Sequence, residues 1–86
     1  MPLDDVQAWM EGWYRDSSRT QDELPLQSSI AEAFGHDNSL IEEMLKDAER
    51  EFHVSDLHFE PTTYQTTTPA LLAHEISHVI QRSQGR

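Results

Sequence analysis

Apolar residues recur at helical spacing in three stretches of the chain, and this pattern predicts three main helices. The first stretch covers about residues 4–15, with apolar positions at Val6, Trp9, Met10 and Trp13. The other two cover about 39–52 and 69–81, where apolar stripes alternate with charged or polar positions. We expect the three helices to pack their apolar faces around a common core, with the aromatic residues of the first helix serving as packing.

The polar segments between these helices predict one further short helix and two loops. Ser29 is placed to cap a short helical turn, and Gly35 suits the left-handed residue that ends one. Thr68 before a proline indicates the beginning of the last main helix. Residues 16–29 show no sustained period and predict a long loop, and residues 53–60 predict a second loop followed by at most one helical turn.

The length of 86 residues leaves room for one core, so we expect a single domain over residues 1–86. Its predicted fold class is all-α, a small bundle of four helices with three main helices and one short one. The chain has no cysteine, which excludes disulfides and thiolate zinc sites. No apolar run reaches the length of a membrane span, and the N-terminal residues lack the features of a secretion signal. We therefore expect a cytoplasmic protein without a membrane partner.

The charge of the chain is strongly negative, with 16 Asp and Glu against 6 Lys and Arg and a formal net charge of -10. This balance disfavours nucleic acid and anionic membranes as partners. Eight of the acidic residues fall between Asp37 and Glu60. The second main helix is thus predicted to have an acidic face that is either merely solvated or docks onto basic partners, with Glu42, Glu43 and Asp47 as candidate docking residues.

The turn before the second main helix contains the most informative motif. Residues 34–40 read Phe-Gly-His-Asp-Asn-Ser-Leu, which resembles a degenerate form of the Gly-x-Asp-Ser-Leu signature of the acyl carrier protein family. Residues 49–54 resemble the end of that family's second helix, and residues 69–74 resemble the beginning of the last helix in polyketide synthase carrier domains. The order of the predicted elements is also similar to that of the family, whose fold is a small four-helix bundle.

The resemblance implies that Ser39, between Asp37 and Leu40, carries a phosphopantetheine arm that holds an acyl group for fatty acid or polyketide biosynthesis. A negatively charged phosphodiester at a helix beginning is stabilised by free backbone amides. A second register, aligned without a gap from the end of the helix, places Asn38 where the serine belongs and leaves no hydroxyl there. Ser39 is also placed where a helix cap can lie.

The same resemblance implies the partners and the absence of catalysis. A phosphopantetheinyl transferase and acyl-processing synthase enzymes would meet the acidic face through basic docking patches. The chain would then not be an enzyme. An alternative within this fold is a carrier-like protein without an arm, which acts by protein contact alone.

A second motif lies in the last main helix, where residues 74–78 fit the His-Glu-x-x-His signature of zinc peptidases. It gives the other alternative, a truncated zinc-peptidase-like domain with His74 and His78 as metal ligands. Only eight residues follow His78, and none of them is His, Asp or Glu. Helical geometry also places both histidines on the side away from Leu72 and Ile76. We therefore expect two surface histidines and no metal site.

Overall fold

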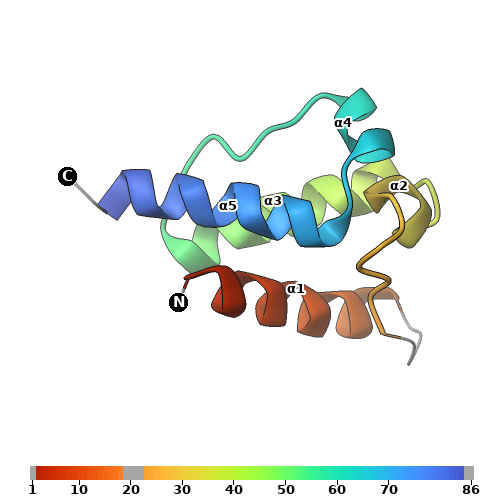
Figure 1. Ribbon diagram of the computed structural model, residues 1–86, viewed down its shortest axis with the longest axis horizontal. Helices are drawn as coiled ribbons and strands as arrows, with labels where there is room; N and C mark the ends of the chain where they lie inside the picture. The colour runs from red at the N-terminus through yellow and green to blue at the C-terminus, as the bar shows by residue number, and fades with distance from the viewer. Residues whose placement is uncertain (1, 19–22, 85–86) are drawn as a thin grey trace.

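The computed structural model describes residues 2–18 and 23–84, which form helices joined by loops (Figure 1). The five helices are α1 (Pro2–Ser18), α2 (Ile30–Ala33), α3 (Asn38–Phe52), α4 (Pro61–Thr66) and α5 (Pro69–Gln84). The predicted all-α class with three main helices is confirmed. The turn expected after residue 60 is a second short helix, α4, so the structure has two short helices beside the three long ones in its described ranges. Among the helices in these ranges, none is both long and apolar enough to cross a membrane.

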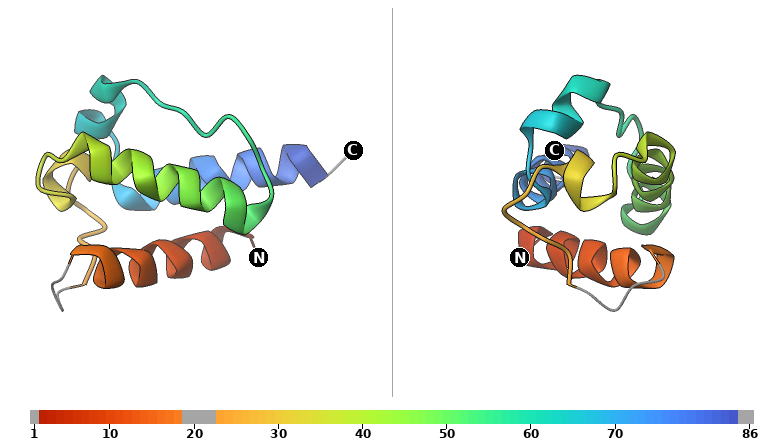
Figure 2. Two further views of the ribbon diagram at one scale, coloured as in Figure 1. Left: turned by 180° about the vertical axis from the view of Figure 1, so that it is seen from behind. Right: turned by 90° about the vertical axis from the view of Figure 1, so that its right-hand side faces the viewer.

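The three long helices lie side by side, and the two short ones gather at one end of them (Figures 1 and 2). Helix α1 packs along α5 and runs in the opposite direction, and α3 lies on the other side of the bundle. Helices α2 and α4 pack together, and the backbone amide of Ile30 donates to the carbonyl oxygen of Thr67 at 2.8 Å. The first turn of α1 and the last turn of α5 lie at the same end, opposite α2 and α4.

The buried side chains form one apolar cluster to which all five helices contribute. Helix α1 contributes Val6, Met10 and Tyr14, α3 contributes Ile41, Met44, Leu45 and Ala48, and α5 contributes Leu72, Ala73, Ile76 and Ile80. Tyr64 of α4 is among the largest fully buried side chains. This cluster fixes α1 against α5 and α3, and so determines which of their outward-facing residues become neighbours.

The caps predicted at Ser29 and Thr68 and the left-handed turn predicted at Gly35 are present. The side-chain oxygen of Ser29 accepts a hydrogen bond from the amide of Glu32 at 3.1 Å, and that of Thr68 accepts one from the amide of Leu71 at 3.2 Å. Gly35 has a φ of +66°, the left-handed conformation that glycine adopts at no steric cost. Leu24 is buried and anchors the described end of the loop before α2.

The segment between α3 and α4 returns along the bundle as an extended strap, residues 53–60 (Figure 1). Leu57 fixes its middle, since the side chain is buried and the amide donates to Oε2 of Glu49 at 2.9 Å. His53 ends α3 in the left-handed conformation, with its amide bonded to the carbonyl oxygen of Glu49. The strap is therefore attached to α3 by both backbone and apolar contacts.

Candidate functional site

The beginning of α3 holds the residues that the sequence singled out for attachment. Asp37 is the helix cap, because its Oδ1 accepts a hydrogen bond from the amide of Leu40 at 3.1 Å. Asn38 and Ser39 form the first turn of the helix and are exposed, whereas Leu40 is half-buried against the core. The expectation that Ser39 can serve as the cap is wrong, since that position already lies inside the helix.

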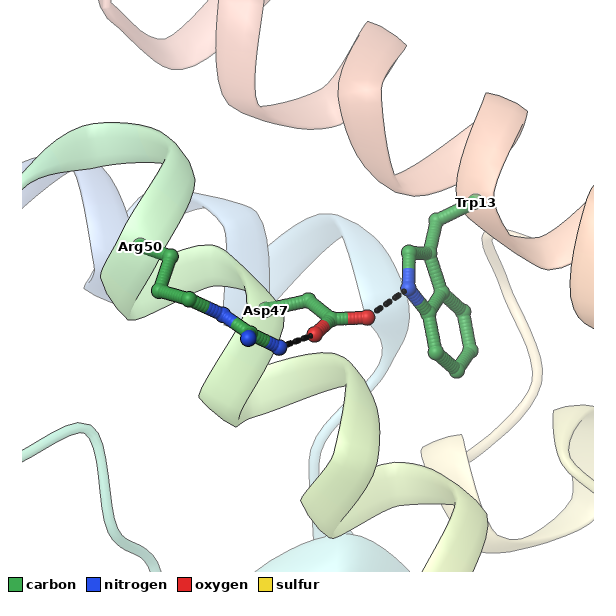
Figure 3. Close-up of polar contacts among 3 residues, drawn as sticks. All are labelled: Trp13, Asp47 and Arg50. Carbon is green, nitrogen blue, oxygen red and sulfur yellow. Dashed lines mark hydrogen bonds and ion pairs between the residues drawn. The ribbon is translucent and has the colours of Figure 1, made fainter.

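The candidate docking residues on α3 differ in how free they are. Glu42 and Glu43 are exposed to solvent. Asp47 is instead held by two contacts within the protein: its Oδ2 accepts a hydrogen bond from the indole Nε1 of Trp13 at 2.8 Å, and its Oδ1 pairs with the guanidinium of Arg50 (Figure 3). A docking role for these three carboxylates stays a prediction.

The contacts of Asp47 also change its acidity. The hydrogen bond from Trp13 is the largest cause that holds the pKa of Asp47 below its usual value of 3.8. Partial burial acts in the opposite direction, and the hydrogen bond and positive charge of Arg50 add to the lowering. Asp47 is therefore a permanently charged acceptor at neutral pH.

A groove of about 360 Å³ lies beside this contact, between α1 and α3. It is lined by Trp9, Trp13, Asp47, Arg50 and Glu51. Both indoles are half-buried and contact other aromatic rings. Trp9 meets the half-buried Phe52 edge to face at 5.6 Å between ring centroids, and Trp13 meets the buried Phe34 at 6.4 Å. The groove thus combines two positioned aromatic rings with two carboxylates and one guanidinium.

The sequence did not reveal this groove as a site. The pattern placed Trp9 and Trp13 on the packing face of the first helix, and they do pack, but each keeps part of its ring in contact with solvent. The available signals were the i, i+4 spacing of the tryptophans and the i, i+4 spacing of Asp47 and Glu51. Neither spacing predicts that this face of α1 meets this face of α3, because the contact depends on the angle at which the two helices cross.

A second hollow of about 300 Å³ lies between α3 and the strap. Its lining is mostly charged and consists of Glu42, Leu45, Lys46, Glu49, Asp56, Leu57 and His58. One of these carboxylates, that of Glu49, already accepts the amide of Leu57. We assign this hollow to the attachment of the strap.

The two histidines of α5 are exposed, as the helical pattern predicts. Their Nε2 atoms lie 2.9 Å apart, and the rings are nearly perpendicular with centroids 4.4 Å apart. Within residues 2–18 and 23–84, no group of three or more His, Cys, Asp or Glu side chains is placed to hold a metal ion. His74 and His78 therefore form a pair of imidazoles without a third ligand among these residues.

Comparison with known proteins gives one result. Residues 22–86, well over half of the chain, match the family model described as the eCIS core domain. Neither the curated proteins nor the solved structures contain a match.

This match shows that the resemblance to the acyl carrier protein family is misleading, and that an acyl carrier function, with or without an arm, is wrong. The zinc-peptidase alternative is likewise unsupported, and the terms of fatty acid and polyketide biosynthesis no longer apply. The structure gives the physical reason for the false motif. Gly35 supplies a left-handed turn, Asp37 caps α3 and Leu40 packs on the core, so the residues that carried the resemblance are those that a capped helix needs. A phosphopantetheine group on Ser39, or on the Asn38 register, has no family resemblance left to support it.

Proposed function

Because this chain belongs to the eCIS core domain family, we propose that it is a component of a contractile injection system. The observation that carries the proposal is the match over residues 22–86, which includes helices α2 to α5. The chain would act there by contact with other proteins, as a cytoplasmic binding component and not as an enzyme. Nucleic acid and membranes are not among its proposed partners, since a net charge of -10 opposes both.

The surface of the molecule supports a role in protein contact. Glu42 and Glu43 project from α3 into solvent, and the groove beside Trp13 opens between α1 and α3. Exposed carboxylates of one sign speed the encounter with a basic surface and add little to affinity. We therefore propose a partner with a basic docking patch, and we place the contact on the α3 side of the bundle.

Co-purification with assembled particles tests this proposal. Contractile particles would be isolated by sedimentation from the organism that encodes the chain, which would carry an epitope tag. We expect the tagged chain to sediment with the particles and to be lost from that fraction when particle assembly is prevented by deletion of a sheath gene. Its absence from intact, purified particles at every stage of assembly would overturn the proposal.

Charge-reversed variants test the location of the contact. Glu42→Lys together with Glu43→Lys is expected to lower the amount of chain in the particle fraction, because it removes the acidic face of α3. Glu23→Lys together with Glu75→Lys is the matched control, since it changes the net charge equally at two exposed positions elsewhere. An equal loss in both double variants would show that only total charge matters, and an unchanged amount in both would place the contact on another face.

A further inference from the structure

We propose that the groove between α1 and α3 binds an arginine side chain presented by a partner protein. The inference rests on the proposed function only in that the chain acts by protein contact. The inference goes beyond that function because it names the side chain that the partner presents and the groove that receives it. Neither the family match nor the acidic composition gives this information.

The aromatic part of the groove is positioned in advance. Trp9 and Trp13 lie one turn apart on the same face of α1, and both are half-buried. Trp9 is fixed edge to face against Phe52, and Trp13 is fixed by its hydrogen bond to Asp47. Indole is the ring that attracts a cation most strongly, and rings that are already held lose little conformational entropy when a ligand binds.

The charged part of the groove has one carboxylate to spare. Arg50 and Trp13 occupy the two oxygens of Asp47. Glu51 lies one turn further along the same face of α3 and is exposed, and its carboxylate makes no hydrogen bond or ion pair to any residue in the described ranges. The lining thus has a formal charge of one negative unit, which an incoming cation would neutralise.

These features favour a guanidinium over other groups. Its planar fork can pair with the two oxygens of a carboxylate such as Glu51 while its face stacks on an indole such as Trp9. An ammonium is a compact, strongly hydrated charge that does not combine the two contacts in this way. An apolar side chain would cover part of the groove and gain nothing from Glu51, and an anion would be repelled by the net charge of the whole molecule.

The two tryptophans make the groove directly observable, because the chain contains no others. Their fluorescence emission would be recorded during titration with the peptide acetyl-Gly-Arg-Gly-amide. We expect a saturable change with a half-saturation concentration on the order of millimolar, since the site offers one stacking contact and one ion pair. The peptide acetyl-Gly-citrulline-Gly-amide, which keeps the shape and removes the charge, is expected to cause no saturable change.

Two variants connect the signal to the proposed carboxylate. Glu51→Gln is expected to weaken binding of the arginine peptide about fivefold, with an unchanged circular dichroism spectrum. Glu23→Gln, at an exposed position that does not line the groove, is expected to bind as the native chain does. Equal weakening in both variants, or none in Glu51→Gln, would overturn the proposal.

Further outcomes distinguish other occupants. If free guanidinium at equal concentration causes the same saturable change as the peptide, the groove is a small-cation site and the proposed partner is wrong. If the chain self-associates in sedimentation and the arginine peptide abolishes this, the occupant is a second copy of the chain. If the chain binds the arginine peptide but does not sediment with the particles, the proposed assembly is refuted and the groove chemistry is not. If the chain sediments with the particles but does not bind the peptide, only the groove proposal is refuted.

Discussion

The indole of Trp13 donates a hydrogen bond to the carboxylate of Asp47 across 34 positions of sequence, and this contact connects α1 to α3. It is the polar counterpart of the apolar packing between these helices. Hydrogen bonds to a charged group contribute more than those between neutral groups, about 1.5–3 kcal/mol against about 1 kcal/mol. A single contact of this kind can therefore matter to a small bundle whose total stability is of the order of 5–15 kcal/mol.

A double-mutant cycle tests the strength of this contact. Trp13→Phe and Asp47→Ala each remove one partner, and each is expected to lower the free energy of unfolding by about 1–3 kcal/mol. The double variant is expected to be more stable than the sum of the two effects predicts, with a coupling energy of about 1 kcal/mol in urea unfolding. Strict additivity would mean that the indole and the carboxylate do not stabilise each other.

The same contact predicts a pH dependence. The pKa of Asp47 in the folded protein lies below its usual value of 3.8, so its stabilising effect is present above that value and is lost as the pH falls through the lowered pKa. The native chain and Asp47→Asn would be unfolded in urea at about pH 6 and at about pH 2.5. We expect the stability difference between them to be larger at the higher pH. A difference that grows in acid would contradict the direction of the shift.

Removal of the Tyr64 hydroxyl is expected not to destabilise the protein. Its hydroxyl is buried and has no hydrogen-bond partner in the described part of the chain. Tyr64→Phe removes this polar atom and keeps the ring, so the free energy of unfolding is expected to stay unchanged or rise by up to about 1 kcal/mol. A loss of more than about 1 kcal/mol in urea unfolding would show that the hydroxyl is satisfied.

Alkaline titration gives an independent measurement on the same residue. Burial raises the pKa of Tyr64 above its usual value of 10.0, and the charges of Glu42 and Glu60 raise it further. In Tyr14→Phe, Tyr64 is the remaining tyrosine, and its ionisation by ultraviolet absorbance is expected to have a midpoint above 10.0. The folded protein is correspondingly expected to lose stability as the pH rises past the usual value.

The beginning of α3 provides a comparison of two neighbouring polar residues. Asp37→Ala removes the cap of the helix and is expected to cost about 1 kcal/mol in the free energy of unfolding. Ser39 is exposed, so Ser39→Ala is expected to change the free energy of unfolding by less than about 0.5 kcal/mol. Chemical denaturation of both variants checks this, and the opposite order would assign the cap to Ser39.

The histidine pair of α5 predicts the behaviour of the untagged chain on immobilised nickel. Two imidazoles with Nε2 atoms 2.9 Å apart can both reach a metal that still has open coordination positions on the resin. We expect retention at low imidazole, and its loss in His74→Ala and in His78→Ala. His58→Ala is the control, since this exposed histidine lies on the strap. Equal retention of all three variants would assign the binding to other residues.

The local structure was largely predictable from the sequence because it depends on near neighbours. Ser29 and Thr68 cap helices through amides three positions away, and the apolar stripe of α3 selects its own buried face. The length of α4 was underestimated because its sequence is rich in threonine, and tertiary burial of Tyr64 outweighs that weak propensity.

The site was not predictable in the same way. Trp13 and Asp47 each follow a clear local pattern, but their contact depends on how two helices cross, which no local period specifies. The false carrier motif arose from the opposite cause: Gly35 and Asp37 are a strong local signal for a capped helix, and such a signal carries no information about function.

Helix α1 lies outside the segment that matches the family, yet it supplies Val6 and Met10, both fully shielded from solvent, and the aromatic wall of the groove. A relative that consisted of the matched segment alone would expose to solvent the apolar residues that Val6 and Met10 cover here. Such a relative would need another helix to cover this apolar surface, either from its own chain or from a neighbouring protein. Helix α1 of this chain can therefore be regarded as an intramolecular substitute for a partner helix, and the groove lies along its edge.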